Sequence, residues 1–448
     1  MNQNQESSTK NSNKKLKKST TIITFAAIAL LLVLGVGIFL FNSEKPKAPT
    51  NEPTTQVEQQ KGPTTISNSS WADGIWLAGR DKSSVEQITI VPNQKVDGVA
   101  YWSYDGINMT IDDGAVTIFV NGNLKITGLV ERMFADMTNL KSIQGLEYID
   151  FSESKSLKGM FQNCAKLQSV DVSYMNLQKV ENLSYMFDGC LELKNIKFNM
   201  DKIETATDAT AMFQHCSTIQ SITLPQLPNV TTMENMFKGT GQGSGGNTTL
   251  KTQFNTSKCT NFNGMFELSG FVNYDVVTNM DTTSMTTASR MFHSATIEEL
   301  DLSAWKTSNL KDTSNMFGYC AHVIKINTNG WDCSSLETAE AMFEQTTSLT
   351  DLTLNWKNIN QLKNVSKMFK QCFALYELDL TCFNGLHFEN ANEMFSGNQW
   401  TEKIKCSGFT ANDSTEMFRF CKVLKGAESF NETKLTAEMA NTNGYFVE

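Results

Sequence analysis

The chain has 448 residues, of which 40% are hydrophobic and 19% are charged, and its formal net charge is -9 at pH 7. This length is too great for one compact core and suits an elongated stack. The acidic balance argues against a nucleic-acid partner, because neutralising phosphates requires clustered Lys and Arg side chains.

An uncharged apolar segment near the N-terminus predicts a membrane anchor. Residues 21–41 contain no charge, and a helix of that length spans ~31 Å, which is the thickness of a bilayer's hydrocarbon core. We expect a transmembrane signal anchor at residues 19–42 that contacts lipid over residues 20–41. Lysines precede it, so the positive-inside rule leaves the basic tail, residues 1–18, in the cytoplasm and the repeats outside the cell. The alternative is a cleaved, unusually long signal peptide and a secreted protein.

Two segments follow the expected anchor. Residues 43–70 contain four of the seven prolines and few large apolar residues, so we expect a disordered linker there. Residues 71–131 contain short alternating runs, such as residues 85–91, separated by Asp-Gly and Asn-Gly pairs that favour turns. This pattern predicts a small antiparallel β domain that caps the repeats described next.

A repeat dominates the remaining sequence. The dipeptide Met-Phe occurs twelve times, from Met133 to Phe418, at intervals of 23 to 29 residues, which is typical of leucine-rich repeats. When each Met is numbered zero, apolar residues recur at +7, +10 and +12, as in Leu167, Val170 and Val172. That is the strand pattern L-x-x-L-x-L. Apolar positions at -6, -3, 0 and +4 follow helical spacing and predict a short helical turn around each Met-Phe pair.

The repeat predicts an α/β solenoid. We expect a right-handed, leucine-rich-repeat-like stack of about 12 coils, each with one strand and one short helical turn. The β cap and the transmembrane helix would precede this stack. The coils would occupy residues 132–430, and residues 431–448 would form a C-terminal capping repeat. A single strand or turn cannot bury its apolar face alone, whereas stacked coils can.

Two blocks in register carry a resemblance to a known family. Residues 301–310 (Asp-Leu-Ser-Ala-Trp-Lys-Thr-Ser-Asn-Leu) run into residues 316–320 (Met-Phe-Gly-Tyr-Cys). These blocks resemble the BspA-type leucine-rich repeat, also called the bacterial surface protein 26-residue repeat, and the resemblance covers residues 128–448. The chain departs from the family pattern at residues 239–247, where a glycine-rich loop lengthens one coil.

The resemblance implies a role in binding. Members of that family are bacterial surface proteins, and some are implicated in adhesion to host proteins or to other bacteria. It therefore implies a non-catalytic cell-surface protein whose partner is a host or bacterial surface protein or glycan. The alternative is a structural cell-envelope scaffold without a dedicated ligand, whose copies associate with one another.

The cysteines admit three interpretations. Six of the ten occur at position +4, where other coils place Ala, Ser or Thr, and this pattern predicts a small buried side chain. Disulfides between coils about 4.8 Å apart are an alternative. A zinc site is disfavoured because the sequence has no C-x-x-C pair.

Other motifs also have a structural interpretation. Residues 241–246 satisfy G-x-G-x-x-G, but no strand and helix flank them, so we expect a flexible loop and no nucleotide site. An aromatic column at about +14 could form a sugar-stacking platform, but we expect it to close the corner of each coil within the core. It comprises Trp305, Trp331, Trp356, Phe383 and Phe409. Because no nucleophile elbow or H-E-x-x-H motif is present, we expect no enzyme, cofactor or metal.

Polar residues within the expected strands are the candidate site. Side chains at about +9 and +11 leave the core on the opposite side of each strand, and solenoids commonly bind along that side. The alternative is a plain solvated surface. The candidate binding residues are Glu299, Asp301, Lys325, Asp351, Glu377, Asp379, Lys403 and Lys405.

Overall fold

The computed structural model describes most of the chain after residue 76. The described residues are 77, 79–92, 102–104, 107–112, 114–120, 124–244, 248–251, 254–271 and 273–448. The predicted tail, anchor and linker, residues 1–70, lie outside this part of the chain. No helix among the described residues is long and apolar enough to cross a membrane.

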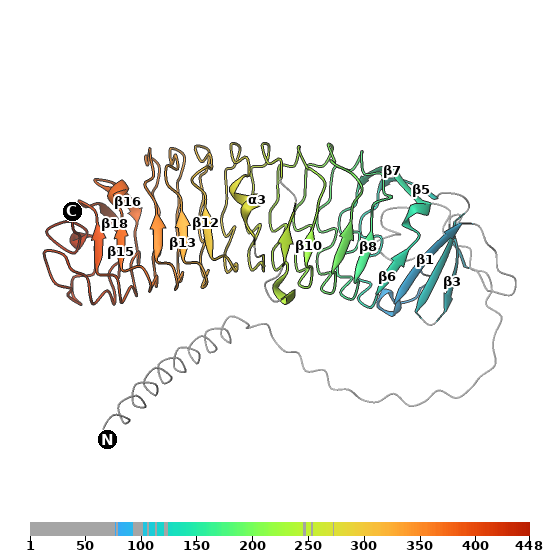
Figure 1. Cartoon of the computed structure of the whole chain (residues 1–448), viewed down its shortest axis with the longest axis horizontal. Helices are drawn as coiled ribbons and strands as arrows, with labels where there is room; N and C mark the ends of the chain where they lie inside the picture. Colours follow the sequence, from blue (N-terminus) through green and yellow to red (C-terminus); the bar gives the residue numbers. More distant parts are fainter. Residues whose placement is uncertain are drawn as a thin grey trace, which may run out of the picture. The chain divides into compact units, whose positions relative to one another are not determined.

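The described repeats form a β-solenoid. The twelve Met-Phe segments delimit eleven coils, and these lie side by side in one row (Figure 1). The first ladder of short parallel strands runs along one side. Its strands pair in parallel with strands of neighbouring coils, except the first, which pairs with the N-terminal sheet. Its strands are β6 (Ser142–Gln144), β8 (Ser169–Asp171), β9 (Asn195–Lys197), β10 (Ser221–Ile222), β11 (Thr249–Leu250), β12 (Glu299–Asp301), β13 (Lys325–Asn327), β14 (Asp351–Thr353), β15 (Glu377–Asp379) and β17 (Lys403–Lys405).

The strand pattern expected from the sequence is confirmed. In β12 and β15 the central leucines, Leu300 and Leu378, are buried, while the flanking acidic residues are exposed. Alternation therefore separates a core side from a solvent side, as the period of two requires.

A second parallel ladder was not anticipated. It begins with β5 (Leu124–Leu129) on β7 (Ile149–Ser156) and ends with β16 (His387–Asn390) on β18 (Thr410–Asp413). Single bridges connect the coils between these pairs, for example Asn182 to Asp208. In most coils an Asn or Asp in this ladder accepts a hydrogen bond from the amide two residues later, as Asp312 does from Ser314 at 2.8 Å. Such turns explain why the polar residues are placed here.

The predicted helical turn around each Met-Phe pair is wrong. The residues at -1 and +3 have φ between 52° and 84° in all twelve segments, a conformation that an α-helix of L-residues cannot contain. Consecutive tight turns replace the helix: the amide of Met160 donates to the carbonyl of Leu157 at 3.1 Å. The amide of Phe161 instead donates to Met186 of the next coil at 2.9 Å. Tandem turns also place a side chain in the core at every third or fourth residue. The apolar positions in the sequence therefore have the same spacing as those of a helix.

The Met-Phe phenylalanines form a continuous stack through the core. Neighbouring rings, from Phe134 to Phe418, lie 5.4–5.9 Å apart between centroids and nearly parallel. All twelve rings are buried. Burial of so much aromatic surface is the main stabilising contribution that stacking provides.

The N-terminal sheet is mixed, and the expected antiparallel β domain is corrected accordingly. β2 (Trp102–Tyr104), β3 (Ile107–Asp112) and β4 (Ala115–Val120) are antiparallel neighbours. β1 (Gln87–Pro92), however, pairs in parallel with both β4 and β6, so it joins this sheet to the first ladder. At the other end of the solenoid, Tyr445 and Phe446 are buried against the last coil, and Val447 bridges to Lys405 of β17.

Helical structure is sparse. The α-helix among the described residues is α3 (Asp275–Thr278), a single turn. The 3-10 turns are η2 (Lys82–Ser84), η3 (Leu146–Tyr148), η4 (Gln242–Ser244), η5 (Thr381–Phe383) and η6 (Ala437–Met439).

Candidate binding face

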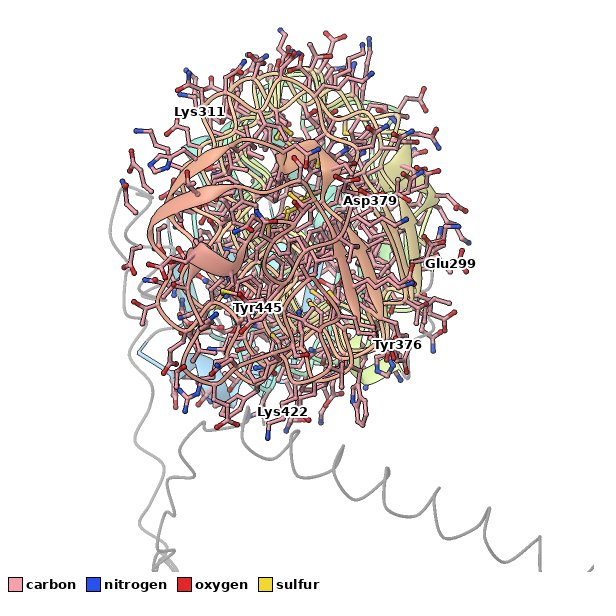
Figure 2. The ribbon with its side chains drawn as sticks, turned by 90° about the vertical axis from the view of Figure 1, so that its left-hand side faces the viewer. Glu299, Lys311, Tyr376, Asp379, Lys422 and Tyr445 are labelled. Atoms are coloured by element: carbon pink, nitrogen blue, oxygen red, sulfur yellow. The ribbon has the colours of Figure 1, made fainter. Side chains whose placement is uncertain are left out.

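The eight predicted site residues lie on the solvent side of the first ladder, and we call them the charged face. Four of them belong to the three-stranded sheet β12–β13–β14 and four to the pair β15–β17. Viewed down the stack from its C-terminal end, Glu299 and Asp379 lie on one flank, whereas Lys311 lies on the other (Figure 2). The structure therefore brings the predicted residues to one side of the molecule, in two groups.

Charges on this face pair between neighbouring coils. Lys325 Nζ lies 3.0 Å from an Asp351 carboxylate oxygen, and Lys403 Nζ lies 2.7 Å from Glu377. The hydrogen bond and charge of Asp351 raise the pKa of Lys325, and those of Lys403 lower the pKa of Glu377. Because these pairs are exposed, each contributes little to stability, and they mainly set the pattern of charge that a partner would meet.

Two of the predicted residues also have a structural role. Asp301 accepts hydrogen bonds from the amide and hydroxyl of Ser303 at 3.0 and 2.6 Å, and Asp379 does the same with Thr381 at 3.0 and 2.8 Å. The Ser303 bonds lower the pKa of the Asp301 carboxyl below its ordinary value. These carboxylates stabilise the turn that follows each strand. This structural role explains why the two aspartates are present without invoking a ligand.

The first ladder is interrupted in the coil that begins at Met265. Where other coils have a strand, this coil has α3, and the Tyr274 side chain before it turns into the core. The Tyr274 hydroxyl lies 3.0 Å from Ser269 Oγ, and its ring meets Phe266 and Phe292 edge-on at 5.7 and 5.9 Å. An additional large ring therefore enters the core at the point where this coil departs from the strand path.

The interruption leaves a cavity of about 510 Å³ between α3 and β12, which we call the α3 slot. Its lining includes Asp275 and Thr278 from α3, and Glu299, Leu300 and Asp301 from β12. Sequence reasoning missed it. The signal was the pair Tyr274-Asp275 at the place where other coils show an apolar residue between polar ones.

A second polar surface, beside the Met-Phe turns, was also missed. Glu267 is buried there, 2.5 Å from Arg290 and 3.3 Å from Lys238. Burial by itself would raise the pKa of Glu267, but the hydrogen bond and charge of Arg290 and the charge of Lys238 lower it overall. Arg290 also donates to His293 Nδ1 at 3.3 Å. The charged and polar groups of these residues pair with one another between coils, so we assign them a structural role.

The cysteines at +4 pack in the core, as their column pattern predicts. Each of the six is buried, and its thiol donates to the Phe carbonyl of the preceding coil, as Cys190 does to Phe161 at 3.2 Å. Thr240 makes the same bond to Phe213 at 2.8 Å. In seven segments the column therefore supplies a hydrogen-bond donor to the preceding coil as well as a small buried side chain.

The aromatic column is also part of the core, as predicted. Its five side chains are at most 5% exposed, and Trp331 stacks between Trp305 and Trp356 at 6.1 and 6.0 Å. Its rings are therefore not available for sugar stacking. Large exposed apolar side chains occur elsewhere, notably Tyr376 and Trp400 at 58% and 57% exposure, and nothing in the repeat pattern indicated them.

The glycine-rich segment is not a simple flexible loop in its described part. Residues 242–244 form η4, and the amide of Gly243 donates to Ser217 of the preceding coil at 2.8 Å. A Cβ on Gly241 would lie 2.1 Å from Thr248 Oγ1, so close packing explains this glycine.

A known protein family matches the chain, and its matches repeat along the row of coils. The family described as "Mycoplasma protein of unknown function, DUF285" matches residues 128–248, 207–327 and 320–438. These three successive, overlapping matches cover more than two thirds of the chain, and each contains four or five Met-Phe segments. No curated protein and no solved structure matches the chain significantly. The chain belongs to the DUF285 family, and its repeats are the coils of a β-solenoid.

Proposed function

We propose that this chain is a non-catalytic bacterial cell-surface protein that binds a protein or glycan through the charged face. The segment predicted to cross the membrane, residues 19–42, would anchor it, and the BspA-type resemblance supports the adhesive role. DUF285 membership itself specifies no activity.

One contrast carries the proposal: the core columns are constant and the exposed columns vary. Every coil repeats Met-Phe, and eleven ring contacts hold those phenylalanines in one stack. On the solvent side the same backbone position holds Glu299, Lys325, Asp351, Glu377 and Lys403 in successive described strands. A rigid scaffold that displays different side chains at equivalent positions suits recognition of an extended partner.

A structural envelope scaffold is the second candidate. Its support is the set of exposed apolar side chains, Tyr174, Tyr376 and Trp400, which are not among the eight residues of the charged face and would mediate association of copies. Such a scaffold would self-associate without using the charge pairs.

Charge swaps test the charged face without removing its ion pairs. The double variants Lys325→Asp with Asp351→Lys, and Lys403→Glu with Glu377→Lys, retain opposite charges but reverse their order. The matched control, Lys363→Glu with Glu389→Lys, reverses an exposed pair of 3.0 Å on the second ladder. Full-length proteins are compared for binding to whole cells, matrix proteins and wall glycans.

We expect the two face swaps to weaken binding at least tenfold while the control swap leaves it unchanged. Far-UV circular dichroism checks that each variant is folded. Binding that survives both face swaps contradicts the charged face as the site. A parent protein that binds only its own copies, with equal strength in all variants, supports the scaffold instead.

A further inference from the structure

The α3 slot exposes one strand edge within the first ladder. On either side of β12, the Glu298 carbonyl accepts from the amides of Ile324 and Lys325 at 2.8 and 3.4 Å, and the Leu302 amide donates to the Asn327 carbonyl at 2.8 Å. These bonds point toward β13. Because N–H and C=O groups alternate sides in a parallel ladder, those of Glu299 and Asp301 point toward α3. No described residue on the α3 side hydrogen-bonds to them.

The opposite side of the interruption is closed differently. The Asn273 side chain accepts from the amide of Leu250 in β11 at 3.1 Å and donates to its carbonyl at 3.2 Å. This side-chain amide thus replaces a neighbouring strand. At this interruption the β12 edge has no strand neighbour among the described residues, and an open edge is a ready template for another extended chain.

The charges around the slot differ from those on the rest of the charged face. Asp275, Glu298 and Glu299 have no ion-pair partner within the described part of the chain, whereas Lys325 is held by Asp351 at 3.0 Å. Asp275 and Glu299 both line the slot, and so does Lys325, which is the in-register neighbour of Glu299 but makes its hydrogen bond to Asp351. A partner that supplies cationic side chains would therefore complement it.

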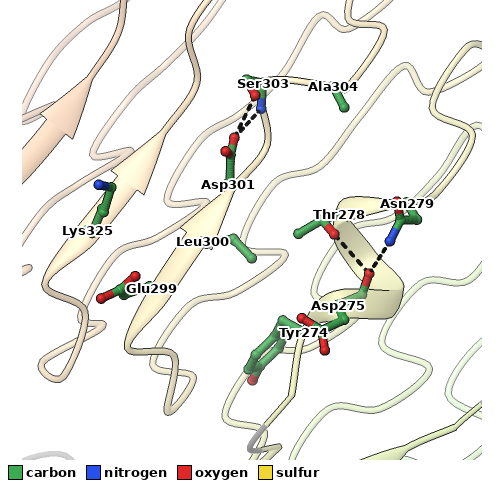
Figure 3. Close-up of a pocket in the computed structure, with 10 residues that line it drawn as sticks. All are labelled: Tyr274, Asp275, Thr278, Asn279, Glu299, Leu300, Asp301, Ser303, Ala304 and Lys325. Atoms are coloured by element: carbon green, nitrogen blue, oxygen red, sulfur yellow. Dashed lines mark hydrogen bonds between the residues drawn. The ribbon is translucent and has the colours of Figure 1, made fainter.

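The base of the α3 slot is apolar and tightly packed. Leu300 and Tyr274 are 3% and 8% exposed, and the Tyr274 ring is fixed by its bond to Ser269 and by the flanking phenylalanine rings. Thr278 and Leu300 extend toward one another from α3 and β12 (Figure 3). The volume of about 510 Å³ falls within the range of small-ligand sites and suits a few peptide residues.

We infer that the α3 slot binds a short extended peptide segment with Lys or Arg side chains, which adds as a strand to the free edge of β12. The backbone groups of Glu299 and Asp301 would bond to the peptide backbone, and Asp275 and Glu299 would pair with its cationic side chains. This inference rests on the proposed binding function and specifies the class of partner.

The test uses a fluorescent pentapeptide, acetyl-Thr-Lys-Val-Lys-Thr-amide, and the full-length protein. Fluorescence anisotropy measures its Kd for the parent, for the double variant Asp275→Asn with Glu299→Gln, and for the control Glu337→Gln with Glu389→Gln on the second ladder. Two further peptides separate the contributions: one is N-methylated at alternate amides, and the other carries norleucine in place of lysine.

We expect at least tenfold weaker binding for the slot variant, for the N-methylated peptide and for the norleucine peptide, and no change for the control variant. Amide hydrogen exchange that is unchanged outside the slot confirms that the slot variant is folded. If removing the charges weakens peptide binding but N-methylation does not, docking at the strand edge is overturned. That result would indicate a general attraction of the cationic peptide to acidic groups.

The failure of this inference is distinguishable from failure of the proposed function. If the pentapeptide does not bind the parent while the swap of Lys403 and Glu377 still abolishes capture of a surface ligand, the slot is overturned and the charged face stands. If the peptide binds with the expected pattern but no surface ligand responds to the face swaps, the slot stands alone.

Discussion

The indole Nε1 of Trp305 donates a hydrogen bond to the carbonyl oxygen of Val277, one coil earlier, at 3.0 Å. Trp331 makes the corresponding bond to Leu302 at 2.9 Å. Val277 lies in α3, whereas Leu302 directly follows β12. The coil that lacks a strand is therefore back on the common path at Val277, within α3, where it provides the same kind of acceptor for the next coil.

The Trp305 bond should stabilise this coil measurably. Trp305→Phe removes the indole donor and leaves the buried Val277 carbonyl with backbone donors such as the Met280 amide at 3.2 Å, so we expect a loss of about 0.5–1.5 kcal/mol in the free energy of unfolding. Trp400→Phe, at a residue that is 57% exposed, should change it by less than about 0.5 kcal/mol. Urea unfolding followed by circular dichroism measures both, and equal effects would contradict the role of the hydrogen bond.

The left-handed positions before each Met should favour glycine. Lys367 has φ of 56°, so Lys367→Gly should stabilise the protein by about 0.5–1 kcal/mol because strain is relieved. Lys363→Gly, in the extended second ladder of the same coil, should destabilise it by a similar amount. The two variants are compared by their midpoints of thermal unfolding. A shift in the same direction for both would contradict the left-handed conformation of Lys367.

The thiols should differ sharply in reactivity. Burial raises the pKa of Cys320 and of Cys372 to about 12, whereas Cys382 is only partly buried. In native protein at pH 8, iodoacetamide should therefore modify Cys382 well before the six cysteines at +4. Mass spectrometry of timed digests measures the order, and urea should make all ten react alike. Fast modification of Cys320 in the native state would be inconsistent with this packing.

Stability near Arg290 should depend on pH through His293. Burial, with the positive charge of Arg290, lowers the pKa of His293 to about 4 from an ordinary value of 6.5. Below pH 6.5 the unfolded state therefore binds more protons than the folded state, so stability is present above that pH and falls as the pH drops toward 4. We expect a loss of about 1–2 kcal/mol between pH 7 and pH 5, because the ring retains some solvent contact.

The variant His293→Gln isolates this contribution. Because glutamine does not titrate, thermal unfolding of the variant should depend less on pH over the same range. Parallel curves for variant and parent would show that other groups cause the pH dependence.

The sequence by itself determined the repeat, the strand positions and the buried columns. Each of these depends on local periodicity: alternation puts Leu300 inside and Glu299 outside, and the +4 column is filled mostly by small side chains such as Cys190. Such patterns repeat in every coil, so many copies reinforce one interpretation.

Only the tertiary structure decided which backbone carries the Met-Phe pair and where the first ladder is interrupted. Tandem turns and a helix both return to the core every three or four residues, and bonds between coils, such as Phe161 to Met186, select the turns. The α3 slot depends on Tyr274 packing among rings from neighbouring coils, and the charge pairs depend on which residues stack. Contacts between residues about 26 positions apart are set by stacking, which local periodicity does not specify.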